Sequence, residues 1–301
     1  MDHDFLERIL KELNRKRHFL LFLFVLYVLL ASLFGTAGFG LIVTSAIAFE
    51  GLALGLGLGA GFLSFLALTP IFILLSLKSL PKYQKLYYEK LVPLLFPEDA
   101  NYQVVLSKKK EYEPIVSRVD RMLRRSFDID RCSYFRGKVD GIPFYTFCYD
   151  NYVSTRRARK EVLFTGRYVF FQRPGNRELL IKEKGKVSLF RKFSLPHKIP
   201  SESIVFDEGY EVDSPDEKDR LSPEVIDLIL SLNREMEGKI NIKSDRDGLS
   251  IFYDHYLSPF RFSLTRKATL KQVEDFRQEL LLPKRLARLL PFFAQREKVL
   301  P

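Results

Sequence analysis

The sequence has few of the residues that most enzymes and metalloproteins use for chemistry. It contains four histidines, two cysteines and no tryptophan. The histidines are scattered at His3, His18, His197 and His255, and no metal-ligand spacing relates them to each other or to the cysteines. A G-x-S-x-G elbow, a P-loop and an H-E-x-x-H motif are also missing. We therefore predict no catalytic residue, no metal and no cofactor, and we favour a non-enzymatic protein.

Charge is missing from a long N-terminal segment. Between Phe19 and Leu77 the single formal charge is Glu50, which separates uncharged stretches of 31 and 27 residues. A bilayer core roughly 30 Å thick is crossed by about 20 apolar residues in a helix, and a cleaved signal peptide has only one short apolar run. We therefore predict a transmembrane helical hairpin at 19–77. Residues 1–18 form an amphipathic cytosolic segment that lies on the membrane surface or extends the first span.

Basic residues flank both apolar runs, whereas the connection between them carries only Glu50. The positive-inside rule then places both termini in the cytoplasm. The flanking residues are Arg8, Lys11, Arg15, Lys16 and Arg17 before the first run, and Lys78, Lys82, Lys85 and Lys90 after the second.

Glycines at helical spacing occur in the second apolar run. Small residues four apart let two helices approach closely in a membrane. Two interpretations stay open: packing against the first span of the same chain, which we favour, and formation of a homo-oligomer. The residues concerned are Gly51, Gly55, Gly57, Gly59 and Gly61.

The formal net charge of +11 lies entirely after Leu77, because residues 1–77 hold five basic and five acidic side chains. A basic domain beside a bilayer is attracted to anionic lipids. The basic clusters are predicted to contact lipid headgroups or an acidic protein partner, and the alternative is that they are solvated surface. No nucleic-acid recognition motif is present. The clusters comprise Lys108, Lys109, Lys110, Arg124, Arg125, Arg156, Arg157, Arg159 and Lys160.

Hydrophobic periodicity divides the remainder into a juxtamembrane helical connector at 78–130 and an α+β cytosolic domain at 131–301. The connector contains helices at 83–95 and 113–127 separated by a break at 97–101. In the domain, Asp140-Gly141 between apolar runs predicts a hairpin. This hairpin sets Cys148 opposite Ser133, so we expect free thiols.

Further strands are predicted at 162–171, with Gly166 as a bulge, and at 179–182, 187–190, 203–206, 210–212, 239–243, 249–253 and 260–264. Asp245 to Gly248 is interpreted as a hairpin turn. Ser222-Pro223 begins one helix, and another covers about 269–282. The domain is predicted to be mainly antiparallel β with flanking helices, and the strand count before Ser222 permits a pleckstrin-homology-like barrel.

Several of these features together resemble a known family. They are the two N-terminal spans, Phe164-Thr-Gly-Arg-Tyr168 after the Gly141 hairpin, Tyr210-Glu-Val-Asp-Ser-Pro-Asp-Glu leading into Leu221-Ser-Pro-Glu, and the hairpin within 240–253. The chain resembles the bacterial two-span membrane proteins grouped as domain of unknown function thirty-one thirty-seven. The resemblance implies a cytosol-facing α+β domain on a membrane hairpin in a bacterial inner or plasma membrane.

These observations favour a membrane-tethered cytosolic module that binds a protein partner or an anionic lipid surface. The alternative is a component of an oligomeric transporter or channel assembled through the glycine-rich spans.

Overall fold

The computed structural model describes residues 3–48, 69–96, 101–122, 127–129, 134–154, 160–173, 178–184, 194–255 and 266–294. The chain divides into two units. The helical unit comprises Met1–Lys90 and Arg261–Glu274, and the sheet unit comprises Leu91–Phe260 and Asp275–Pro301.

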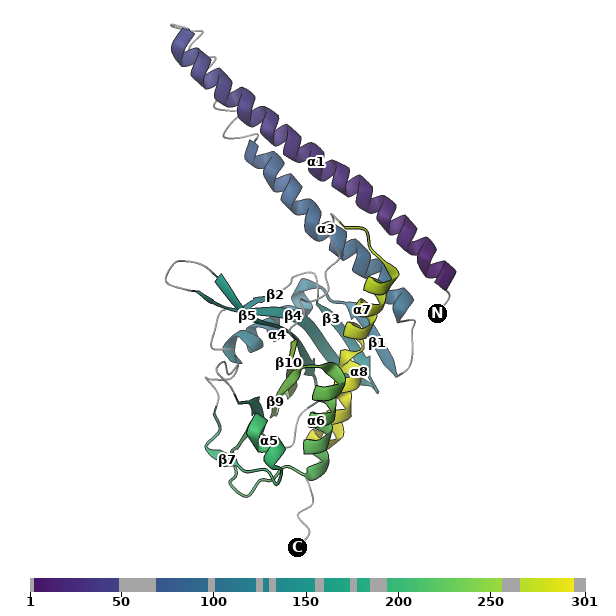
Figure 1. Ribbon diagram of the computed structural model, residues 1–301, viewed down its shortest axis with the longest axis vertical. Coiled ribbons are helices and arrows are strands. Elements are labelled where there is room, and N and C mark those ends of the chain that lie inside the picture. Colours follow the sequence, from purple (N-terminus) through teal and green to yellow (C-terminus); the bar gives the residue numbers. More distant parts are fainter. Residues whose placement is uncertain are drawn as a thin grey trace. The chain divides into compact units, whose positions relative to one another are not determined.

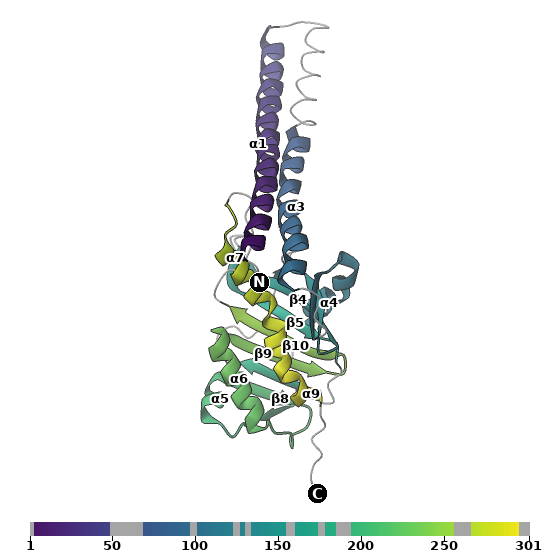
Figure 2. The same ribbon diagram turned by 90° about the vertical axis from the view of Figure 1, so that its right-hand side faces the viewer.

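Two long helices dominate the helical unit. α1 (His3–Ala48) is a single helix of 46 residues, so the N-terminal segment 1–18 continues, from His3, into the apolar run as one helix. α3 (Thr69–Leu95) lies beside it in the opposite direction (Figure 1, Figure 2). Phe72 of α3 stacks on Phe34 of α1 with ring centroids 5.5 Å apart. Toward the other end of the pair, the Tyr87 hydroxyl donates to Oδ1 of Asn14 at 3.2 Å.

The described strands of the sheet unit form one antiparallel sheet in the order β1-β3-β4-β5-β10-β9-β6-β8-β7, and β2 also pairs with β4. The strands are β1 (Tyr102–Leu106), β2 (Phe127–Ile129), β3 (Phe135–Val139), β4 (Ile142–Ser154), β5 (Lys160–Phe171), β6 (Leu179–Glu183), β7 (His197–Ile199), β8 (Tyr210–Ser214), β9 (Lys239–Asp245) and β10 (Gly248–His255).

One face of the sheet is packed against α4 (Lys109–Met122). Ile115, Val119 and Met122 of this helix belong to a buried cluster with aromatic side chains of β4, β5 and β10. Tyr168 lies in that cluster, with its ring centroid 4.7 Å from that of Phe252. The helix forms because its apolar residues recur every three or four positions, which places them on one side.

The opposite face carries the C-terminal helices. α6 (Pro223–Met236) begins after Ser222, with proline at its first position, and buries Ile229 and Leu232. α7 (Leu270–Leu280) contributes Phe276, which packs on Phe135 of β3 at 6.0 Å between ring centroids. The chain then passes through α8 (Leu282–Leu286), a 3-10 turn (Ala287–Leu289) and α9 (Leu290–Ala294).

Both two-residue hairpins predicted from the sequence are confirmed. In the first, Val139 pairs with Ile142, and Asp140 and Gly141 have φ values of 49° and 78°. In the second, Asp245 pairs with Gly248. The α+β class with a large antiparallel sheet is confirmed as well.

Three local predictions are wrong. The connector 78–130 is not entirely helical, because β1 lies within it and pairs with β3. Residues 204–209 form the helix α5 (Ile204–Gly209) instead of a strand, since Ser203 caps it by accepting the Phe206 N–H. Gly166 is not the bulge, because the register shift in the β4–β5 pair lies at Asn151/Tyr152.

Gly166 has a different role. A β-carbon at this position would lie 2.5 Å from the backbone oxygen of Tyr253 and 2.8 Å from the Tyr149 hydroxyl. The close approach of these groups excludes any side chain.

The predicted strands at 187–190 and 260–264 lie outside the described residues. Two predicted strands, at 239–243 and 249–253, come after the Ser222 helix, and the structure places them as β9 and β10 near the middle of the sheet. The strands before Ser222 therefore form only part of the sheet, and their number alone does not predict its fold.

Candidate functional site

The basic residues predicted to contact lipid or a partner are only partly described. Lys108 and Lys110 are exposed where α4 begins. Lys109 lies in the same helix and Lys160 begins β5, but their side chains are outside the described part, as are residues 124, 125, 156, 157 and 159. The predicted glycine stripe, residues 51–61, also lies outside the described residues, so the oligomeric transporter or channel stays a prediction.

Acidic side chains accompany the basic residues at the start of α4. The Glu111 carboxylate accepts the Lys108 backbone N–H at 2.8 Å and the Ser107 hydroxyl at 3.0 Å. The Lys108 N–H contributes most to a lowered pKa for Glu111. Arg136 adds an ion pair at 3.2 Å. This end of α4 is therefore an exposed surface of mixed charge.

α1 has an exposed apolar surface over much of its length. Within the described residues it is the helix long and apolar enough to cross a membrane, and only 6% of its most apolar window is buried. Phe19, Phe22, Leu29 and Leu33 are each 61% exposed. In a water-soluble protein such a run of large side chains would normally be covered.

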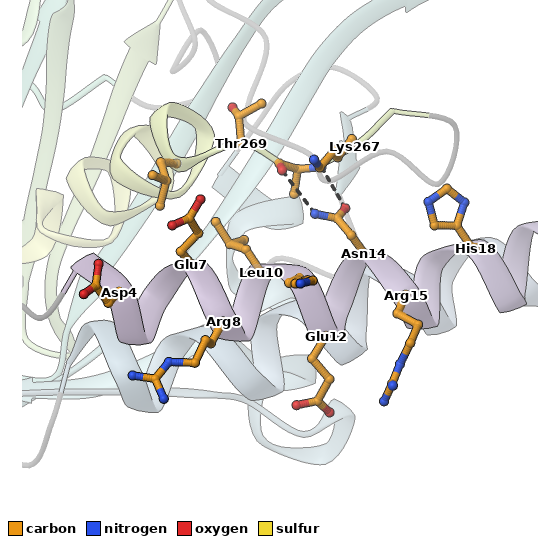
Figure 3. Close-up of a pocket in the computed structure, with 13 residues that line it drawn as sticks. Asp4, Glu7, Arg8, Leu10, Glu12, Asn14, Arg15, His18, Lys267 and Thr269 are labelled. Atoms are coloured by element: carbon orange, nitrogen blue, oxygen red, sulfur yellow. Dashed lines mark hydrogen bonds between the residues drawn. The ribbon is translucent and has the colours of Figure 1, made fainter.

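A groove lies in the helical unit beside the first turns of α1 (Figure 3). Its volume is about 1270 Å³. Seven charged side chains line it, four basic and three acidic, together with His18 and several neutral residues. The lining comprises Asp4, Glu7, Arg8, Leu10, Lys11, Glu12, Asn14, Arg15, His18, Lys267, Ala268, Thr269 and Leu270.

Asn14 fixes the wall of this groove. Its side-chain nitrogen donates to the Ala268 carbonyl at 3.3 Å, and its Oδ1 accepts the Ala268 N–H at 3.1 Å (Figure 3). The same Oδ1 also accepts the Tyr87 hydroxyl at 3.2 Å. Asn14 and Ala268 are 6% and 5% exposed. One buried amide therefore connects α1, α3 and the segment before α7.

Along α1 the charged lining residues follow in the order Asp4, Glu7, Arg8, Lys11, Glu12 and Arg15, so both signs of charge occur along the groove. Glu7, His18, Lys267 and Thr269 all line the groove (Figure 3). The acidic Asp4 and Glu7 occupy the end distant from the apolar part of α1. Glu12 pairs with Lys16 at 3.1 Å, and the hydrogen bond from Lys16 lowers the pKa of Glu12.

The sheet unit contains two partly buried ionic clusters on the face that also packs α4. Arg118 of α4 donates to both carboxylate oxygens of Asp245, at 2.6 and 2.7 Å, and to Asp247 at 2.7 Å. Burial of Arg118 and Asp245 favours their neutral forms. The negative charge of Asp245 nevertheless raises the pKa of Arg118. The hydrogen bond from Lys243 and the charge of Arg118 lower the pKa of Asp245.

The second cluster joins β6 and β8. Lys182 contacts Asp213 at 2.7 Å and Glu211 at 3.4 Å. The hydrogen bond from Lys198 contributes most to a lowered pKa for Glu211. Each carboxylate in both clusters is thus matched to a cation, which is typical of structural ion pairs. Among the described residues no group of three or more histidine, cysteine, aspartate or glutamate side chains is placed to hold a metal ion.

Comparison of the chain with models of known families, with curated proteins and with solved structures found no match. The resemblance to domain of unknown function thirty-one thirty-seven therefore stays a prediction.

Arg8, Lys11 and Arg15 line the groove, although their sequence pattern predicted only the membrane topology and no binding site. Asn14 was not singled out at all. Its position on the otherwise apolar side formed by Leu6, Leu10 and Leu13 is the one signal that a buried polar contact exists there.

Proposed function

We propose that this protein is a membrane-tethered, non-enzymatic module. α1 and the apolar run that leads into α3 form a transmembrane hairpin, and the sheet unit faces the cytosol, where it binds a protein partner or an anionic lipid surface. The proposed membrane is a plasma or bacterial inner membrane. Membership of domain of unknown function thirty-one thirty-seven is part of the same proposal.

The exposed apolar surface of α1 supports the proposal most strongly. Residues 19–48 of the helix span about 45 Å at 1.5 Å per residue, which exceeds the roughly 30 Å of a bilayer core. In an aqueous setting these exposed Phe and Leu side chains would be unfavourable by roughly 25 cal/mol per Å² of apolar surface. Lipid removes that cost.

The charge pattern supports the orientation. Basic residues precede Phe19 and follow Leu77, and the uncharged region between them contains only Glu50. Short flanks rich in Lys and Arg stay on the cytoplasmic side. The sheet unit then lies on the same side as the N-terminus.

Protease accessibility of the full-length chain tests this arrangement. We expect the chain to resist extraction by alkaline carbonate. A protease added outside sealed cells should leave the sheet unit intact, whereas the same protease should digest it in inverted vesicles. Carbonate extraction of the chain, or digestion from outside, would contradict the proposal.

The binding role requires a separate measurement. Cross-linking and affinity capture of the intact protein from its native membrane should recover a partner, and Lys108→Glu with Lys110→Glu should weaken recovery if the start of α4 contributes. The binding role is contradicted if the intact protein recovers no partner and shows no salt-dependent attraction to anionic lipid. This holds even if the topology is as proposed.

A further inference from the structure

We propose that the sheet unit binds a second copy of this chain, with the exposed side of α5 in one copy packed against β1 and β3 in the other. The inference rests on the binding role proposed for the sheet unit and names its protein partner. It places the contact between copies in the sheet unit and not in the glycine-rich run of the proposed membrane hairpin.

The first of the two surfaces lies on α5. Ile204 and Val205 are 79% and 68% exposed, more than any other large apolar side chain described in the sheet unit. Glu208 lies one helical turn after Ile204, and both it and Glu202 are exposed. The α5 surface comprises Glu202, Ile204, Val205 and Glu208.

The charges around the α5 surface are mainly negative. Residues 201–209 contain three acidic side chains, Glu202, Asp207 and Glu208, and no basic one. One cation reaches the segment, since the Lys184 ammonium donates to the Asp207 carbonyl. Among the described residues, neither Glu202 nor Glu208 has an ion-pair partner. Three acidic groups and one basic group leave a local net charge of −2.

The second surface lies where β1 leads into α4. Val105 is 48% exposed and lies opposite Arg136 of β3. Lys138 is on the same face as Arg136, because side chains two residues apart in a strand point to the same side. Lys108 and Lys110 are exposed at the start of α4. The β1 surface comprises Val105, Lys108, Lys110 and Lys138.

The charges around the β1 surface are mainly positive. Its three lysines have no anionic partner in the described part of the chain. Arg136 is paired with Glu111 at 3.2 Å, and Asp140 is exposed in the adjoining turn. Four basic groups and two acidic groups leave a local net charge of +2. The α5 and β1 surfaces therefore both have exposed aliphatic side chains and have opposite charge, which favours their association.

A single copy cannot bring these two surfaces together. α5 leads directly into β8, and Phe206 stacks on Tyr210 with ring centroids 4.9 Å apart. β8 and β1 are seven positions apart in the strand order, roughly 34 Å at about 4.8 Å per strand. Figure 1 accordingly shows α5 and β1 at different ends of the sheet. The complementary surface must therefore come from another molecule, and a second copy supplies it.

The contact would join two different surfaces, so each copy keeps one surface of each kind for a further neighbour. Such heterologous contacts form rings or open rows instead of ending at a pair. We therefore expect cross-linking to give multiples of the chain beyond two. An anionic lipid surface would attract the β1 surface but would repel the α5 surface.

Co-purification of two differently tagged full-length chains in mild detergent tests the inference. We expect each chain to recover the other, and recovery to fall at high ionic strength. Glu202→Lys with Glu208→Lys in both chains should lower recovery by at least about ten-fold, because like charges then face each other. Lys108→Glu with Lys138→Glu in both chains should have the same effect.

Mixing the two variants should restore recovery. The Glu202/Glu208 variant has two basic surfaces and the Lys108/Lys138 variant has two acidic ones, so opposite charges meet again. Restoration also shows that both variants fold. The controls make the same charge changes at exposed residues outside both surfaces, and recovery should stay within about two-fold of the unmodified chain. They are Asp227→Lys with Asp275→Lys, and Arg234→Glu with Arg246→Glu.

Four outcomes would overturn the inference: no recovery between unmodified chains, unchanged recovery in both variants, equal losses in the controls, or no restoration in the mixture. If the Lys108/Lys138 variant loses only its binding to anionic vesicles, the β1 surface binds lipid and the second-copy assignment is wrong. If the copies do not associate but affinity capture recovers a different protein, the assignment is wrong while the binding role stands.

Discussion

The side chain of Asn14 pairs with both backbone polar groups of Ala268, 254 residues away in the sequence. The same Oδ1 accepts the Tyr87 hydroxyl. A primary amide is well suited to this contact because it offers a donor and an acceptor side by side, as a backbone peptide does. Asn14 thus joins three segments of the helical unit at one buried point.

Replacing Asn14 by alanine should destabilise this connection. The Ala268 N–H and carbonyl would stay buried without these partners, at a cost of about 1–3 kcal/mol for each unsatisfied group. We expect amide hydrogen exchange at residues 266–270 to accelerate strongly in the full-length chain in detergent. Asn14→Asp is the matched variant: it keeps the acceptor but cannot donate to the Ala268 carbonyl. Unchanged exchange in Asn14→Ala would show that the hydrogen bonds do not hold the segment.

Substitution by alanine should destabilise the protein at Gly166 but not at Gly209. A methyl group at Gly166 would overlap the Tyr253 backbone oxygen, whereas no atom lies within 4 Å of the corresponding position at Gly209. Overpacking typically costs about 1–3 kcal/mol, and here the obstructing atoms include backbone. We expect Gly166→Ala to lower the urea midpoint of the sheet unit clearly and Gly209→Ala to leave it nearly unchanged. Because the chain has no tryptophan, tyrosine fluorescence is the suitable probe. Similar midpoints for both variants would contradict the close packing.

The Arg118–Asp245 pair predicts a loss of stability in acid. The pKa of Asp245 is lower in the folded protein than in the unfolded chain, where an aspartate has a pKa of about 3.9. The contribution to the free energy of unfolding is therefore fully present above about pH 4 to 5. It is lost as the pH falls through the lower, folded pKa, because protons then bind the unfolded state first.

Asp245→Asn should flatten this acid dependence and should lower stability at neutral pH by roughly 1–3 kcal/mol. Asp247→Asn is the control, because Asp247 meets the same Arg118 but its side chain is 77% exposed, against 15% for Asp245. An exposed pair contributes about 0–1 kcal/mol. Urea unfolding at several pH values measures both variants. Equal acid profiles for the unmodified chain and Asp245→Asn would refute the assignment.

The hairpins could be predicted from the sequence because their signals are local. Asp140-Gly141 supplies two residues that adopt positive φ, and Asp245 accepts the N–H groups of Asp247 and Gly248 within its own turn. The α5 helix was missed because Ile204 and Val205 favour strands, while the capping contact from Ser203 decides the outcome.

Contacts between distant parts of the chain leave no such local signal. Arg118 and Asp245 are 127 residues apart, so their pairing depends on α4 packing over the β9–β10 turn. β1 pairs with β3, where Tyr102 lies opposite Val139, 37 residues away in the sequence. The groove likewise depends on residues from both ends of the sequence. The basic residues Arg8, Lys11 and Arg15 could be recognised in the sequence as topology signals, whereas the contact between Asn14 and Ala268 could not.

Leu29→Lys should distinguish a lipid-exposed helix from a helix covered by protein. Leu29 is 61% exposed near the middle of the apolar run, where a lysine raises the free energy of insertion by about 2.5–3.5 kcal/mol. We expect less of the chain to withstand carbonate extraction. Ile204→Lys is the control, since Ile204 is 79% exposed in the sheet unit and should not affect membrane association. If Leu29→Lys inserts as well as the unmodified chain, the apolar surface of α1 is not the membrane anchor.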